Sequence, residues 1–188
     1  MSATQAFSAR VRECTDQLAV TGVAALGMLY DLTAQRLVRF AVTVSYHQHD
    51  AEDAVQAVLA RLATSPQQLK DVGCPWAYLL RMVRNEVIAI HRRQKRCTAA
   101  GDLSDLITRC PIDEAEREES HRAVWAALRS LPVDQAEVVV LKIWEEMTFA
   151  QIGEILELSL NTVASRYQYG IAKLTSRLTK QPTRVRHG

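Results

Sequence analysis

The sequence predicts an all-α protein of two small helical domains joined by a flexible acidic linker, with a helix-turn-helix in the second domain. Apolar residues recur at helical spacing through most of the chain, and no stretch shows the alternation of a β-strand. The segment 98–119 breaks this periodicity and is strongly acidic. Near the C-terminus, two short helical patterns are separated by only a few residues, which is typical of a helix-turn-helix.

The first domain, residues 1–97, is expected to contain three main helices. Thr21 can cap a helix that runs to about Val44, and Asp50 can cap the next, with Asp53 near the positive end of the same helix. Pro75 suits the first turn of the third helix. Their apolar stripes predict a shared core, in which we place Leu29, Leu37, Phe40, Val55, Val58, Leu62, Trp76, Leu80 and Val83.

The linker, residues 98–119, has seven acidic residues and two arginines, a net charge of −5. The second domain, residues 120–180, begins with a helix that ends before Pro132, and a second helix follows this proline. Thr148 and Gln151 form a capping box at the third helix, and Ser159 can cap the last. Residues 181–188 form a short basic tail.

Composition excludes several classes of protein. With 188 residues, 48% of them hydrophobic, the chain suits one ordinary domain or two small ones. It has neither a run of ~20 apolar residues nor an export signal, so we expect a cytoplasmic protein without membrane insertion. His47 and His49 lack further ligands, and four scattered cysteines form no CxxC pair: Cys14, Cys74, Cys97 and Cys110. We therefore expect no metal and no cofactor.

Basic residues concentrate in two places. The stretch from Arg81 to Arg96 has six basic residues and one acid, a net charge of +5, and the chain from Ala164 onward has six basic residues and no acid. One such run is ordinarily a solvated helix face. Two runs, one of them on a helix-turn-helix, favour a polyanion as partner, with binding that weakens steeply with salt.

Four stretches, in order and at the right separation within residues 22–178, resemble the extracytoplasmic-function (ECF) group of the sigma-70 family of RNA polymerase sigma factors. They are Leu29–Ala41, the acidic helix Asp50–Gln56, the basic helix Leu79–Asn85 with Arg92 and Arg93, and Leu128–Pro132 followed by Thr148–Arg166. The resemblance implies a protein that binds core RNA polymerase and directs promoter-specific initiation of transcription. It also leaves open an anti-sigma factor as a partner.

The resemblance further implies three sets of site residues. Those that dock on the clamp helices of the largest polymerase subunit are Asp50, Glu52, Asp53 and Gln56. Those that bind and melt the minus-10 promoter DNA are Arg81, Arg84, Asn85, Arg92, Arg93, Lys95 and Arg96, with a pocket for an extruded base in the turn Thr64–Cys74. Those that read the minus-35 element are Asn161, Thr162, Ser165, Arg166, Gln168, Tyr169 and Lys173.

The sequence departs from the family pattern at a few positions. Tyr78 stands where a tryptophan is usual and Ala89 where an aspartate is frequent. Ala164 and Tyr169 replace residues that are often basic, which leaves the minus-35 preference open. Glu157 replaces a common turn glycine at some cost to the backbone.

Two other functions compete with this interpretation. A stand-alone helix-turn-helix regulator would leave the acidic and basic helices of the first domain without a role. An all-helical interaction module, such as a regulator that holds another sigma factor, would not need the basic last helix. An enzyme is disfavoured, because the sequence has no glycine-rich phosphate loop, no metal-ligand cluster and no nucleophile elbow.

Overall fold

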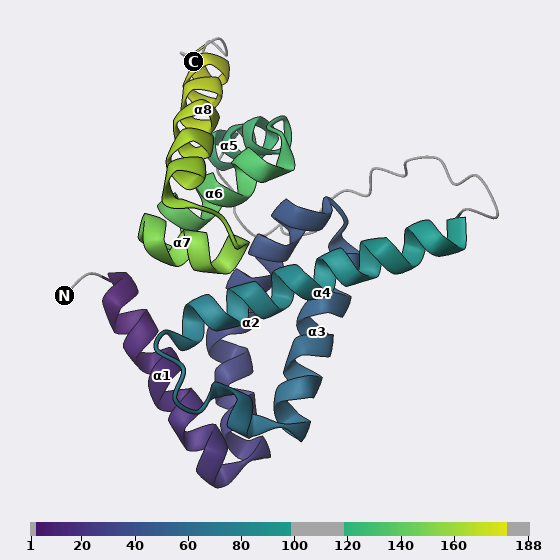
Figure 1. Cartoon of the computed structure of the whole chain (residues 1–188), viewed down its shortest axis with the longest axis vertical. Helices are drawn as coiled ribbons and strands as arrows, with labels where there is room; N and C mark the ends of the chain where they lie inside the picture. Colours follow the sequence, from purple (N-terminus) through teal and green to yellow (C-terminus); the bar gives the residue numbers. More distant parts are fainter. Residues whose placement is uncertain (1–2, 99–118, 180–188) are drawn as a thin grey trace, which may run out of the picture.

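The computed structural model describes residues 3–98 and 119–179, which are helical throughout apart from the connecting turns (Figure 1). The N-terminal domain consists of α1 (Ala3–Thr21), α2 (Val23–Ser45), α3 (Gln48–Thr64), the 3₁₀ helix η1 (Pro66–Leu69) and α4 (Pro75–Thr98). The C-terminal domain consists of α5 (Glu119–Arg129), α6 (Val133–Ile143), α7 (Phe149–Leu156) and α8 (Leu160–Thr179). The predicted all-α class is therefore confirmed. Apart from residues 98 and 119, the predicted linker lies outside the described residues, as does the basic tail.

Helix α2 is the centre of the N-terminal domain, where α1, α3 and α4 all pack against it. The predicted stripes meet in this core: Leu29, Leu37, Phe40, Trp76 and Leu80 are fully buried. The assignment of Trp76 to the core is thus confirmed. The C-terminal half of α4 projects beyond the other helices (Figure 1).

The first two predicted helix caps are wrong. Thr21 ends α1, a helix that the sequence analysis did not predict, and its hydroxyl donates to the Gln17 carbonyl at 3.0 Å. Gly22 joins α1 to α2 with φ 62°, a conformation that glycine adopts easily. Helix α3 begins two residues before Asp50. Asp50 therefore lies in the first turn, where its charge interacts favourably with the helix dipole, but it does not cap the helix.

The predicted start signals of the C-terminal helices are confirmed. The Thr148 hydroxyl accepts from the Gln151 backbone N–H at 3.2 Å, and the Gln151 side chain accepts from the Thr148 N–H at 2.9 Å. Ser159 accepts from the Thr162 N–H at 3.2 Å. Glu157 joins α7 to α8 in the left-handed region, with φ 58°. Gly170 allows α8 to approach α6 closely, since a Cβ there would lie 2.7 Å from Val139 Cγ2.

No helix among residues 3–98 and 119–179 is both long and apolar enough to cross a membrane. Within the same ranges, no three histidine, cysteine, aspartate or glutamate side chains are grouped so that they could hold a metal ion.

Candidate nucleic-acid interface

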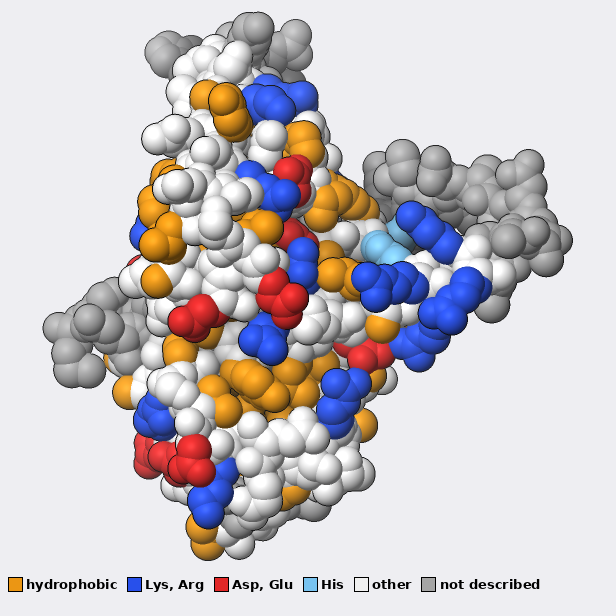
Figure 2. Space-filling model, viewed as in Figure 1, with side chains coloured by type: hydrophobic (Ala, Val, Ile, Leu, Met, Phe, Trp, Pro, Cys, Tyr) orange, Lys and Arg blue, Asp and Glu red, His pale blue; other side chains and the backbone are white. Residues whose placement is uncertain are grey.

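The outer face of α4 presents a row of cations. Figure 2 shows lysine and arginine side chains gathered along the projecting half of this helix. Among the residues predicted to bind minus-10 DNA, most are exposed: Arg81, Asn85, Arg92, Arg93, Lys95 and Arg96. Arg84 differs, because its side chain is only 19% exposed and points into the contact with the C-terminal domain.

A polar cavity of about 340 Å³ lies between the end of α3, η1 and the first half of α4. Arg81 and Asn85, which the sequence analysis selected, line it together with Gln68 and with four residues that it did not select: Arg61, Tyr78, Met82 and Glu86. Gln68 falls within the turn predicted to hold an extruded base. No sequence signal marks Arg61, which meets Glu86 only when α3 packs on α4.

A second groove, of about 480 Å³, separates α2 from α3 and is lined in part by Glu52 and Gln56. Asp53 is exposed next to them, whereas Asp50 is directed toward α4, where it accepts from Gln94 Nε2 at 2.9 Å. The opposite wall comes from α2 and was not predicted: Tyr30, Asp31, Ala34, Gln35 and Val38. Glu52 and Gln56 therefore line the groove with Asp53 beside them, and Asp50 instead links α3 to α4.

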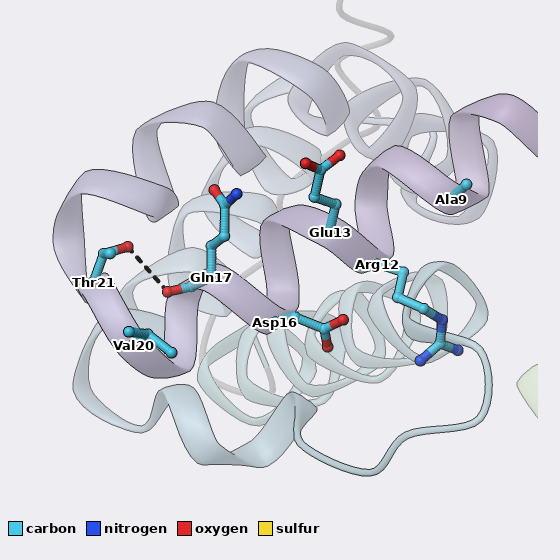
Figure 3. Close-up of a pocket in the computed structure, with 7 residues that line it drawn as sticks. All are labelled: Ala9, Arg12, Glu13, Asp16, Gln17, Val20 and Thr21. Carbon is cyan, nitrogen blue, oxygen red and sulfur yellow. Dashed lines mark hydrogen bonds between the residues drawn. The ribbon is translucent and has the colours of Figure 1, made fainter.

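A shallow pocket of about 510 Å³ lies on α1, where Glu13, Asp16 and Gln17 are among the residues that line it (Figure 3). Arg12 reaches from this helix to the loop before α4, where it donates to the carbonyls of Val72 and Gly73. These contacts fix α1 to the loop that leads into the basic helix.

Most of the predicted minus-35 residues lie on the exposed side of α8. Asn161, Ser165, Gln168, Tyr169 and Lys173 are exposed, and Thr162 and Arg166 are half-buried. Tyr169 is 65% exposed. Val163 and Leu174, on the other side of the helix, are buried. The helix thus offers one polar face at its N-terminal half, where a recognition helix contacts base edges.

The two domains contact each other through a buried carboxylate. Glu145, between α6 and α7, has a side chain that is 1% exposed and forms an ion pair with Arg36 of α2 at 2.8 Å. The buried indole N–H of Trp76 donates to the same carboxylate at 3.1 Å. The Arg36 guanidinium lies 3.9 Å from the ring centre of Phe7, on α1. Burial raises the pKa of Glu145, although Arg36 opposes the shift.

Two acids of α6 each pair with a cation that was predicted to bind DNA. Glu137, with a 4% exposed side chain, accepts from Arg84 Nε at 3.1 Å, and burial raises its pKa. On the same helix, Asp134 pairs with Arg166 at 3.4 Å. The domains are also joined by the Tyr46 hydroxyl, which donates to the Leu131 carbonyl at 3.0 Å. We call this packing of α2 and α4 against α6 and α7 the closed arrangement.

In a comparison with known protein families, two parts of the chain each match a family. The family described as Sigma-70 region 2 matches residues 29–97, and the family described as Sigma-70, region 4 matches residues 121–174. Together these matches span well over half of the chain. Helix α1 precedes both.

Two named relatives cover much of the chain. The ECF RNA polymerase sigma factor SigE of Mycolicibacterium smegmatis is 31% identical over 78% of this chain and 59% of its own length. The ECF RNA polymerase sigma factor SigL of Mycobacterium tuberculosis is 29% identical over 87% of this chain and 93% of its own length. The chain therefore spans less than two thirds of the first of these relatives and nearly all of the second.

Two solved structures share the fold. The sigma factor RpoE in complex with the anti-sigma factor NepR, from Bartonella quintana, is 21% identical with a TM-score of 0.68, covering 84% of this chain and 98% of that one. CnrH in complex with the cytosolic domain of CnrY is also 21% identical, with a TM-score of 0.62, covering 90% of this chain and 97% of that one.

Proposed function

The chain belongs to the ECF group of the sigma-70 family of RNA polymerase sigma factors, and on this premise we propose that it binds core RNA polymerase and selects promoters through their minus-10 and minus-35 elements. The observation that carries the proposal is that one chain contains both regions, and that each region exposes one of the polar helix faces described above. Sigma factors are regulators without enzymatic activity, so the polymerase supplies the chemistry. An anti-sigma factor is a further proposed partner, since the structurally similar sigma factor RpoE is in complex with the anti-sigma factor NepR.

We assign polymerase docking to the groove between α2 and α3. A helix of the clamp could lie along this groove, with Glu52, Asp53 and Gln56 on one side. The exposed ring of Tyr30 and the apolar Val38 would add contact area from the other wall. Such an interface gains its specificity from charge complementarity between acidic α3 and a basic partner helix.

We assign the minus-10 element to α4 and the cavity at its side. Opening a promoter requires cations along an unpaired strand and a pocket for an extruded base. Arg81 and Asn85 line such a cavity, and the exposed cations on the outer half of α4 lead away from it. The exposed face of α8 would enter the major groove at the minus-35 element.

Promoter binding requires the closed arrangement to separate. The two elements are centred about 25 base pairs apart, which is about 85 Å of B-form DNA. In the closed arrangement, however, Arg84 of α4 lies 3.1 Å from Glu137 of α6. While the two domains are in contact, they cannot bind two DNA elements that are about 85 Å apart on one duplex. We infer that Arg84 exchanges Glu137 for a phosphate when the domains move apart.

Run-off transcription tests the proposed function. Core RNA polymerase is assayed on genomic promoter fragments with and without this chain, and we expect specific transcripts only when it is present. A stand-alone regulator would instead bind DNA without copurifying with core polymerase. Absence of both polymerase binding and specific transcripts would contradict the proposal.

The cations of α4 provide a prediction about strand opening. Replacing Arg92, Arg93 and Arg96 with alanine should impair melting and lower the slope of log affinity against log salt by about 2, since each contact to a single strand contributes about 0.7. Permanganate footprinting detects the melted bases. Arg10→Ala, which removes an exposed cation from α1, is the control. Normal opening in the triple variant would exclude this face from melting.

Two residues of α8 should behave differently at the minus-35 element. Gln168→Ala should cost about 1–3 kcal/mol at one base position, because an amide can bond a base edge bidentately. Lys173→Ala should weaken binding evenly across sequences and lower the salt slope by about 1, as expected for a phosphate contact. Both variants are compared on a randomised minus-35 library. Uniform loss for Gln168→Ala would exclude base reading by this side chain.

A further inference from the structure

Glu86 is the sole acid between Arg81 and Arg96, and it lies on the face proposed to hold an unpaired DNA strand. A carboxylate at this position repels phosphates, so its presence on a DNA-binding face requires an explanation. The Glu86 side chain is 12% exposed and lines the cavity between α3, η1 and α4. Its contacts provide that explanation.

Each oxygen of the Glu86 carboxylate accepts from a different arginine. Oε2 accepts from Nη2 of Arg61, in the last turn of α3, at 2.8 Å, and Oε1 accepts from Nη2 of Arg93, two turns further along α4, at 2.7 Å. Arg61 and Arg93 are 48% and 62% exposed, so both keep guanidinium N–H groups open to solvent. Glu86 therefore holds together two cations that belong to different helices.

We propose that Glu86 is a positioning residue that orients Arg61 and Arg93 toward the unpaired minus-10 strand, and that Arg61 is a further contact to this strand. The inference rests on the proposed function. An unrestrained arginine must lose side-chain conformational freedom when it binds a phosphate. A guanidinium already held by a carboxylate loses less of this freedom, so the protein binds the strand more tightly. This gain outweighs the smaller positive charge of Glu86 with its two arginines, compared with two free arginines.

The stability of the fold does not by itself account for this arrangement. Both arginine side chains are about half exposed or more, so solvent screens their attraction to the largely buried Glu86 carboxylate and limits what the pairs contribute to folding. Their partner Glu86 lines the same cavity as Arg81 and Asn85. The ion pairs therefore place Arg61 at the edge of the cavity proposed to receive an extruded base.

The sign of one mutational effect separates positioning from simple repulsion. If Glu86 only repels phosphates, Glu86→Ala should tighten DNA binding, because the face gains a positive charge. If Glu86 positions the arginines, the same variant should bind more weakly, because two contacts to the strand become disordered.

The test uses holoenzyme assembled from core polymerase and the full chain. The probe is the labelled non-template strand of a promoter fragment that yields a run-off transcript. We expect Glu86→Ala and Arg61→Ala each to weaken binding by about three- to tenfold, and the double variant to lose less than the product of the two. Arg61→Ala should also lower the salt slope by about 0.7. Glu13→Ala, which removes an exposed acid from α1, should leave binding unchanged.

Melting temperatures confirm that each variant is folded, and Glu86→Gln, which keeps the side-chain size and one acceptor oxygen, replaces Glu86→Ala if the alanine variant does not fold. Unchanged or tighter binding by the Glu86 variant overturns the inference alone. So do fully multiplicative losses in the double variant, because Glu86 would then not act through Arg61. Failure of the wild-type holoenzyme to give any transcript overturns the proposed function, and this inference with it.

Discussion

Replacing Glu145 with alanine should release the contact between the two domains and lower the free energy of unfolding by about 3 kcal/mol. The substitution leaves Arg36 without its anion and the fully buried Trp76 with an N–H that has no acceptor. If the whole loss falls on the closed arrangement, its population relative to the separated one falls more than about a hundredfold. Small-angle X-ray scattering should then show a larger radius of gyration, and urea denaturation gives the stability.

Glu145→Gln is the matched control, because it keeps the size of the side chain and an oxygen that can accept from Arg36 and Trp76. Burial raises the pKa of Glu145 above the usual 4.5, so the closed arrangement favours the neutral carboxyl. The part of the stability that comes from this pKa shift is therefore complete below pH 4.5 and is lost as the pH rises through the raised pKa of Glu145. The glutamine variant should lack this part of the pH dependence. An unchanged radius of gyration in Glu145→Ala would show that this carboxylate does not hold the domains together.

Reversing two charges on α3, with Glu52→Lys and Asp53→Lys, should weaken binding to core polymerase by about 3 kcal/mol, or more than about a hundredfold. The new lysines would face the basic partner helix that the acidic residues are proposed to attract. Titration of labelled core polymerase measures the affinity. Because both residues lie beyond the first turn of α3, their interaction with the helix dipole is weak, and only a small loss of stability is expected.

The control for this charge reversal is Glu13→Lys with Asp16→Lys, on the outer face of α1 (Figure 3). It changes the net charge of the chain equally but lies outside the proposed groove. Circular dichroism confirms that both double variants are helical. Equal losses of affinity in both would mean that overall charge, and not the groove between α2 and α3, governs docking.

The helices were largely predictable, but one was missed for a clear reason. Helix α1 buries a narrow stripe, in which Val11 and Leu18 flank the polar Thr15, so its apolar periodicity is weak. Without α1, the sequence analysis assigned Thr21 to the start of the next helix. By contrast, the capping box at Thr148 depends on residues three apart and was recognised correctly.

The cavity beside α4 was half predictable. Arg81 and Asn85 are four residues apart on one basic helix, so helical geometry places them together. Arg61 reaches the cavity from another helix, and its bond to Glu86 spans 25 residues of sequence. No local pattern encodes that contact, because it depends on how α3 lies against α4.

The sequence by itself determined the helical class, the helix-turn-helix and the two basic surfaces, because these follow from local periodicity, capping and composition. Only the tertiary structure decided which cations stand free. Arg84 carries the same charge as its exposed neighbours on α4, yet it pairs with Glu137, 53 residues away and 4% exposed. An ion pair depends on the distance and burial of two groups, and packing sets both once α4 meets α6.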